Sequence, residues 1–466
     1  MIMAHAANPG KSSWTSIMLK PRGLVMPLVA TLIMTFSLAS CIRKAGGAGG
    51  GTDGTFLVDD PGKCDDLRQS SGKVPEELES KVIAAVLSDS SYSSSSLVGV
   101  DLGAKKVCKV ASGESGDTLL VAGTQGLVAF SRRAPQLNYS VFTPMGRTTQ
   151  QATPLAGNGD PHGLLEFSSE GLSARWLMAL NTAGKLVDFD PARPSDRTAV
   201  VPEELSSGLA ATPEFRPVDM MLVRGDEIAP EALASTGGAL TDEFILVLHQ
   251  GLDQFYRGNG SQAIYAWQRT RSGQYIEADL NPSKAGINGW PLRLSNPSGF
   301  FRSGAKVSLL SLCFSADSAC VKGVEQFELA DVGSTKTPTV LTDFSGNAIF
   351  SNGGSVAGSI KSKDETRDFV FAATQQSSGK KISAIDLASG KVQGLHSFTG
   401  SSNGFFGLAF DRDSSSLIIG DSDGRQALLW VYTLDSEGRV KGSPSRHVLA
   451  TAGQPFPMQF VILDKN

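Results

Sequence analysis

Five cysteines are the residues of this chain best able to form covalent bonds. Cys41 directly follows a run that is apolar from Leu24 to Leu38, whereas the others lie in more polar sequence: Cys64, Cys108, Cys313 and Cys320. Four cysteines can form two disulfides in three pairings. Cys313 and Cys320 bracket a short polar loop, so their bond would close a hairpin and leave Cys64 to pair with Cys108. The alternative is a metal site, which the absence of a Cys-x-x-Cys pair and of a histidine cluster disfavours.

The segment around Cys41 has the features of an export signal. Lys20 and Arg22 precede a short apolar run, which is typical of a secretory signal peptide and too short to span a bilayer comfortably. Leu38-Ala39-Ser40-Cys41 resembles the lipobox of bacterial lipoproteins, in which the cysteine is lipidated and becomes the new N-terminus. We therefore expect a signal peptide over residues 1–40 and a lipid anchor on Cys41. An ordinary signal peptide, or a start at Met18, also fits this sequence.

Charge and composition favour an exported β-rich protein. Lys and Arg number 42 against 46 Asp and Glu; without residues 1–40 the balance is 39 against 46, a net charge of −7. This mild acidity has no basic stripe, so nucleic acid is not an expected partner. The chain has 51 glycines and only 7% aromatic residues, which favours many short strands joined by turns.

Two short segments separate the anchor from the main domain. Residues 41–62 are rich in glycine and predict a tether. Within residues 63–96, Pro75–Leu87 predicts one helix, because a proline and acids begin it and its apolar residues share one helical face. This expected helix would pack on the following domain or dock a partner.

From residue 97 to residue 466 the sequence repeats a two-strand theme. Six segments predict hairpins: Leu119–Phe130, Trp176–Phe189, Phe244–Trp267, Val307–Phe327, Phe369–Ile385 and Leu417–Tyr432. Their second strands begin 46 to 78 residues apart, a spacing typical of β-propeller blades. We therefore predict an all-β propeller of seven blades, although six or eight also fit.

The longest interval and the chain ends complete this prediction. Gly225–Thr241 has no strand pattern and is interpreted as an insertion loop. Pro457–Leu463 predicts a strand that joins two strands from the beginning of the domain, Leu97–Leu102 and Lys106–Ala111. Such a blade would close the ring and remove an open sheet edge. A Cys64–Cys108 bond would then fix the tether to the closing blade.

One segment resembles a known propeller repeat. Ala384-Ile385-Asp386-Leu387-Ala388-Ser389-Gly390-Lys391-Val392 is similar to the quinoprotein-type repeat Ala-x-Asp-x-x-Thr-Gly-Lys, which is followed by a docking tryptophan. Here Ser389 replaces the threonine, and Gln393-Gly394-Leu395 stands in the place of the tryptophan, so we expect no quinone and no other cofactor. Lipid-anchored propellers with such repeats occur in the outer-membrane β-barrel assembly machinery as scaffolds. The resemblance implies a scaffold.

A second resemblance implies a different class of function. Gly407-Leu408-Ala409-Phe410-Asp411 and the following Leu417–Gly424 are similar to blades of lactonase-like propellers, some of which hold an axial divalent metal. Asp421 and Asp423 have the oxygens that such a metal needs, but a hairpin turn explains the same pattern.

The remaining chemical candidates are weakly specified. The histidines beyond the signal segment are scattered, and the most notable lies in Asp160-Pro161-His162-Gly163, which predicts a loop. Trp290, Phe300 and Phe301 could form a contact patch or belong to the core. No nucleophile elbow or phosphate loop is present in the sequence, so we name no catalytic residue and no metal ligand.

The sequence thus favours a lipoprotein of the bacterial outer membrane, anchored through lipid on Cys41. Its propeller would act as an interaction platform for an envelope protein. The alternatives are a lactonase-like hydrolase with an axial metal site and an outward-facing adhesin.

Overall fold

The computed structural model describes residues 64–464 apart from a set of gaps. The gaps are residues 90, 92, 115–117, 124–125, 133–137, 144–145, 152–159, 168–174, 191–192, 201–214, 238–241, 253–259, 271–273, 284–287, 295, 312–322, 344–354, 364, 377–378, 399–406 and 450–455. The predicted signal peptide, Cys41, the tether, Cys313 and Cys320 lie outside the described residues. No helix in the described part of the chain is long and apolar enough to cross a membrane.

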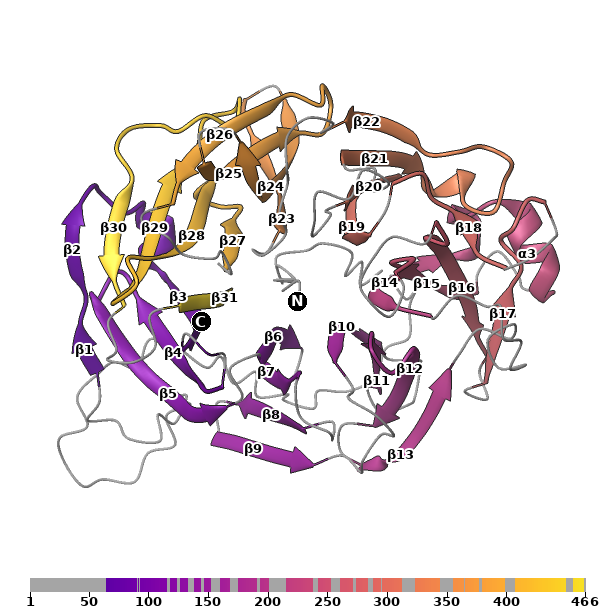
Figure 1. Ribbon diagram of the computed structural model, residues 1–466, viewed down its shortest axis with the longest axis horizontal. Helices are drawn as coiled ribbons and strands as arrows, with labels where there is room; N and C mark the ends of the chain where they lie inside the picture. Colours follow the sequence, from indigo (N-terminus) through magenta and orange to yellow (C-terminus); the bar gives the residue numbers. More distant parts are fainter. Residues whose placement is uncertain are drawn as a thin grey trace, which may run out of the picture.

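The described residues form seven antiparallel sheets that stand in a ring (Figure 1). Four sheets each consist of four consecutive strands. These are β6–β9 (Thr118–Gly123, Gly126–Ser131, Asn138–Thr143, Gly146–Gln151), β10–β13 (Pro161–Phe167, Arg175–Leu180, Lys185–Asp190, Arg193–Val200), β19–β22 (Pro297–Ser303, Lys306–Ser311, Gly323–Glu328, Thr339–Asp343) and β23–β26 (Ser355–Lys361, Thr366–Gln376, Gly379–Asp386, Val392–Ser397).

Three sheets carry an additional strand. The first contains β14–β17 (Pro217–Arg224, Glu243–His249, Ala263–Arg269, Tyr275–Ala278) and β18 (Trp290–Pro291). The second contains β27–β30 (Leu408–Asp411, Ser416–Ser422, Ala427–Thr433, Ser445–Val448) and β2 (Arg68–Ser71). The third, the closing sheet, has the order β1-β5-β4-β3-β31, with bounds Cys64–Asp66, Lys106–Glu114, Ser95–Asp101, Lys81–Ser88 and Phe456–Asp464.

The closing sheet joins the two ends of the described chain. Its innermost strand β31 comes from the C-terminal end and pairs antiparallel with β3 from the N-terminal end. This confirms the prediction that one blade is assembled from both ends. The six predicted hairpins are also present, each as two adjacent antiparallel strands.

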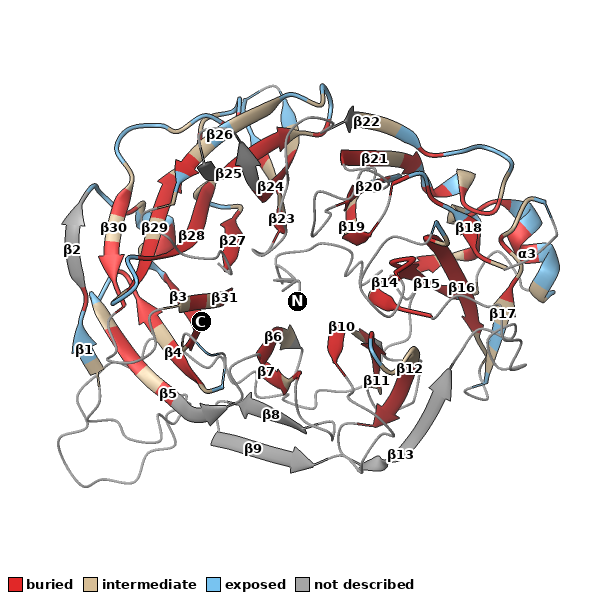
Figure 2. Ribbon diagram, viewed as in Figure 1, coloured by how far each residue is buried: buried red, intermediate tan, exposed pale blue. Residues whose placement is uncertain are grey.

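The core lies between the sheets. Each of the seven hydrophobic clusters joins two neighbouring sheets, and together the clusters run all the way around the ring. Figure 2 shows the buried residues on the inner and middle strands and the exposed ones on the outer turns. An antiparallel sheet that is covered on both faces in this way explains why the middle strands are almost continuously apolar. The predicted propeller architecture is confirmed.

Several of the strands nearest the centre of the ring contain a proline at an irregularity in their pairing. Four of them carry a proline next to a shift in their pairing register: Pro161, Pro217, Pro297 and Pro457. Proline has no N–H to donate and is tolerated on an edge strand or at a bulge, which is where these lie. Two polar side chains that follow such prolines cross to the next sheet: Asp219 accepts the N–H of Phe300 at 2.8 Å, and Gln459 accepts that of Leu120 at 2.5 Å. Burial raises the pKa of Asp219 to about 6, against the lowering effect of its backbone hydrogen bonds.

The predicted helix over Pro75–Leu87 is wrong. Only α1 (Glu76–Glu79) is helical, and Lys81–Ser88 is strand β3 with every residue buried. A helix would bury one face, but this segment lies between two sheets: Ile83 packs toward the β27–β30 sheet and Val86 toward the β6–β9 sheet. Alternate residues therefore serve opposite faces, as in a strand. Residues 64–96 contribute strands to the propeller and do not form a separate helical segment.

The expected insertion loop at Gly225–Thr241 contains two short helices, η2 (Gly225–Glu227) and α3 (Pro230–Thr236). Proline at the first turn begins α3, and Gly237 with φ 66° ends it. Ala232 and Leu233 pack into the neighbouring core. A further short helix, η3 (Leu329–Asp331), follows β21. Trp290 is only 1% exposed, so it belongs to the core and not to a surface patch.

Candidate functional site

A pocket of about 290 Å³ lies between the β23–β26 sheet and the β29–β30 hairpin. Its residues come from the beginning of β24, from β25 and β26 with the turn between them, and from the β29–β30 connection. They are Glu365, Arg367, Phe369, Ala384, Asp386, Ala388, Ser389, Lys391, Gln393, Glu437 and Arg439. Three cationic and three acidic side chains thus surround a floor that contains one buried aromatic ring.

The β25–β26 turn fixes one wall of the pocket. Asp386 accepts the N–H groups of Ala388 at 2.7 Å and Ser389 at 3.1 Å, and Gly390 takes a φ of 71°. A short acidic side chain that caps its own turn, followed by a glycine at positive φ, is a common turn chemistry. The quinoprotein-like segment is therefore a hairpin whose turn presents Lys391. Gln393, which stands in the place of the docking tryptophan, lines the pocket instead.

The β29–β30 connection forms the opposite wall. Gly438, with φ 72°, lies against the ring of Phe369; a Cβ at this position would lie 2.6 Å from a ring carbon. Asp435 accepts the N–H groups of Glu437 and Arg439, both at 2.9 Å. The hairpin is thus held tightly over the floor, and its two charged residues face the pocket.

Arg367 joins the two walls. Its guanidinium lies 3.1 Å from Glu365, 3.6 Å from Glu437 and 4.0 Å from Asp386. The hydrogen bond to Glu365 and the neighbouring carboxylates raise the pKa of Arg367. Because three acids surround this one cation, its positive charge is more than compensated inside the site. Arg439 pairs with Glu437 at 3.0 Å.

Lys391 is the cation without a partner. Its side chain is exposed, and no acid in the described part of the chain lies within ion-pair distance of its ammonium group. The pocket can therefore attract one further anionic group, such as a carboxylate, at Lys391. Its lining supplies no imidazole or thiol, so the chemistry it offers is ionic and hydrogen-bonded binding.

The segment Asp160-Pro161-His162-Gly163 was expected in a loop, and the structure corrects this. Pro161–Phe167 is the inner strand β10, and His162 is 4% exposed. The His162 ring lies 3.2 Å from Asp160, which also accepts the hydroxyl of Thr182 at 3.1 Å. Burial opposes ionisation of Asp160, but its interactions with His162 and the charge of Arg132 outweigh that effect, so the pKa of Asp160 lies below its usual range. In an antiparallel meander the start of the first strand lies opposite the turn between the third and fourth, so this pair and the pocket lie at opposite ends of the ring.

The candidate metal ligands of the sequence are not brought together. Asp423 accepts the N–H groups of Arg425 and Gln426, both at 2.8 Å, which confirms the turn interpretation. Asp421 is buried and lies 3.3 Å from His396, whose other nitrogen lies 2.7 Å from the hydroxyl of Tyr432. Burial and the charge of Asp421 raise the pKa of Tyr432 to about 12. Within the described ranges, no group of three or more His, Cys, Asp or Glu could hold a metal ion.

The other two histidines are also structural. Nδ1 of His249 accepts the N–H of Arg216 at 2.9 Å, and burial lowers the pKa of this imidazole to about 3. His447 lies 3.1 Å from Ser445, and burial, aided by the charge of Lys105, lowers its pKa to about 4. Both rings are therefore neutral at physiological pH.

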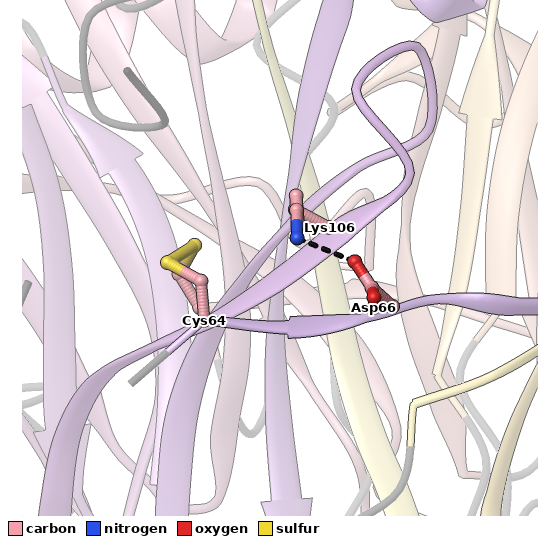
Figure 3. The surroundings of a disulfide bond; sticks show 4 residues. Cys64, Asp66 and Lys106 are labelled. Carbon is pink, nitrogen blue, oxygen red and sulfur yellow. Dashed lines mark hydrogen bonds and ion pairs between the residues drawn. A yellow bond between two sulfur atoms is a disulfide. The ribbon is translucent and has the colours of Figure 1, made fainter. Parts of the chain in front are cut away.

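The first described residues of the chain are attached to the closing sheet by a disulfide. Cys64 of β1 is bonded to Cys108 of β5, as expected from the sequence, and the adjacent Asp66 pairs with Lys106 (Figure 3). This bond lies close to the β4–β5 turn, which joins the third and fourth strands of its sheet. The pocket contains the β25–β26 turn, which is the equivalent turn of another sheet. The point of entry and the pocket therefore lie at the same end of the ring.

Comparison with known proteins finds distant similarity to solved structures. No family model matches this chain, and no curated protein matches it. Solved structures with partial similarity include TolB from Acinetobacter baumannii, with 13% identity, a TM-score of 0.36 and coverage of 83% of this chain and 68% of that one. A putative 6-phosphogluconolactonase from Bacteroides uniformis has 12% identity, a TM-score of 0.46 and coverage of 82% and 100%. The Dos1 propeller has 9% identity, a TM-score of 0.41 and coverage of 85% and 97%.

The pocket was missed by sequence reasoning. Two segments that line the pocket, at the start of β24 and in the β29–β30 connection, carry the same short pattern, Glu365-Thr366-Arg367 and Glu437-Gly438-Arg439, and this repetition is the sequence signal that could have paired them. The segments are some 70 residues apart, and only the packing of two sheets brings them together.

Proposed function

We propose that this protein is a lipid-anchored platform of the bacterial outer membrane whose propeller binds an envelope protein. The observation that carries the proposal is the position of the charged pocket at the end of the ring where the N-terminal segment joins the closing sheet. The lipobox-like Leu38–Cys41 and the glycine-rich residues 41–62 support anchoring upstream of that point. A partner held near the membrane would meet this end of the propeller first.

The way the N-terminal segment is attached to the propeller also supports anchoring, because this attachment can resist a pulling force from the membrane. Three interactions hold the segment to the ring: the disulfide, the pairing of β1 with β5 and the pairing of β2 with β30. Because β5 and β30 belong to neighbouring sheets, force from an anchor would spread over two blades.

The first experiment tests the anchor. Cells that express the protein or its Cys41→Ala variant are grown with an alkyne analogue of palmitate, and incorporation is measured on the purified chain. We expect label in the wild type and none in the variant. Equal labelling of both proteins, or of neither, would contradict the anchor.

The second experiment tests the face used for binding. A photo-reactive residue replaces Gln393 in the pocket or, as a control, the exposed Arg425 in the β28–β29 turn at the other end of the ring. We expect a discrete cross-linked envelope protein from position 393 only. A cross-link from position 425 alone would assign binding to the opposite end.

A further inference from the structure

Two outer edges of this propeller each carry an additional strand. β1 adds to β5 and β2 adds to β30, and both pairs are antiparallel. In each case a short extended segment of this chain completes the edge of a four-stranded unit. The edges thus have the geometry needed for strand addition, a common mode of peptide recognition.

The neighbouring sheet offers the equivalent edge without such a strand. β26 is the outermost strand of the β23–β26 sheet, and among the described strands it pairs only with β25. Of its six residues only His396 is buried. Its sequence, Val-Gln-Gly-Leu-His-Ser, contains no proline, lysine or acid, which are the residues that usually protect an edge from pairing.

This edge begins at the pocket. Lys391 directly precedes Val392, the first residue of β26, and Gln393 on the strand lines the pocket. A peptide that pairs antiparallel with β26 would run toward Val392, so its C-terminal end would arrive at Lys391. The ammonium group there has no acidic partner among the residues that the structure describes, whereas Arg367 and Arg439 are already paired.

We propose that β26 binds the C-terminal segment of a partner protein as an added antiparallel strand, with the terminal carboxylate held at Lys391. The backbone hydrogen bonds would supply affinity for any extended segment, and the carboxylate would select a chain terminus. This proposal rests on the proposed function of partner binding and names the part of the partner that is recognised.

The test is a selection of peptides on the full-length protein. A library of random decapeptides with free C-terminal carboxylates is screened beside the same library in amidated form. We expect enrichment from the free-acid library, and at least roughly tenfold weaker binding by the amide of each selected peptide, since the amide lacks the negative charge that would pair with Lys391. No enrichment, or equal binding of acid and amide, would overturn the proposal.

Two variants identify the cation. Lys391→Glu should weaken the selected peptides at least roughly tenfold, because it places a carboxylate where the peptide's own carboxylate binds. Lys361→Glu is the matched control, since Lys361 is exposed at the same end of the same sheet but does not line the pocket. Similar losses in both variants would show a general charge effect and refute the assignment to Lys391.

Methylated peptides test the strand pairing. In an added antiparallel strand every second amide donates to the edge, and β26 keeps this alternation from Val392 to Gly394, before its pairing register shifts. N-methylation of one alternate set of the peptide amides that face Val392–Gly394 should therefore abolish binding, and methylation of the other set should not. Loss with both sets, or with neither, would contradict strand addition. If the photo-reactive residue at position 393 still yields the cross-link when Lys391 is replaced by Glu, this inference fails and the platform stands. If neither position 393 nor position 425 yields a cross-link while Lys391 is intact, the platform itself fails.

Discussion

Glu325 offers a direct test of how this core responds to pH. The carboxyl group is fully buried on β21, where one oxygen accepts the N–H of Arg293 at 3.0 Å and the other has no hydrogen-bond partner in the described part of the chain. Burial raises the pKa of Glu325 to about 7, although the backbone hydrogen bonds lower it in part. The change to make is Glu325→Gln, which keeps the shape and removes the titration.

The direction in which pH changes the stability follows from comparing the protonation of Glu325 in the folded and in the unfolded chain. Below pH 4.5, the ordinary value for this carboxyl, the group is protonated in both the folded and the unfolded chain and contributes nothing. Between that value and about pH 7, the unfolded chain loses the proton while the folded chain keeps it, so the free energy of unfolding falls as pH rises. Between pH 5 and pH 8 this single carboxyl should lower the free energy of unfolding by roughly 2.5 kcal/mol.

Urea unfolding at pH 5 and pH 8, followed by tryptophan fluorescence, measures the effect. We expect Glu325→Gln to lose stability less steeply over this range than the wild type, by roughly the amount worked out above. Glu328→Gln is the control, because Glu328 is exposed three residues further along the same strand. A wild-type pH slope in Glu325→Gln, or an equal change in the control, would refute the reasoning.

Three further changes probe the closure and packing of the ring. Lys81 is buried and lies 2.5 Å from Asp411, so Lys81→Met should cost about 3–5 kcal/mol by leaving that carboxylate unpaired, and Asp411→Asn in the same chain should restore part of the loss in urea unfolding. Replacing Cys64 and Cys108 together by Ser should cost about 4 kcal/mol in the loop-entropy account, measured as a lower Tm; a reductant should then lower the Tm of the wild type more than that of the variant, and equal Tm values without reductant would contradict this. Gly358→Ala should cost about 1–3 kcal/mol in the same assay, because its Cβ would lie 2.2 Å from a ring carbon of the phenylalanine on β27, and an unchanged Tm would show that the ring can move aside.

The hairpins were predictable because their physics is local. Alternating apolar residues around a short polar turn specify two paired strands, and Leu417–Tyr432 illustrates the rule as β28 and β29. The helix prediction was wrong at Lys81–Ser88 because the deciding contacts there are not local in the sequence. The residues that share one face of a helix there are a subset of those that a strand buries on both faces, and only the presence of two covering sheets distinguishes the two.

The helix α3 and the pocket were missed for different reasons. Pro230 and Gly237 are ordinary start and stop signals, but the segment between them is short and rich in small residues, so its periodicity is weak. The pocket depends on a long-range juxtaposition, because Arg367 and Glu437 belong to different sheets. No local pattern specifies which hairpin of the next sheet will cover a given turn.

The order in which the chain is made has a consequence for how the ring closes. The innermost strand of the closing sheet, β31, is the last described element to be synthesised, while its neighbour β3 is among the first. Until Phe456–Asp464 is available, β3 has no inner partner, and the apolar side chains of Phe460 and Ile462 are missing from the cluster that they complete. A chain that stops short of these residues retains an open strand edge, which is a site for aggregation and for proteolysis. Completion of synthesis and closure of the ring are therefore coupled, because the last described strand of the chain is the one that covers the inner edge of β3.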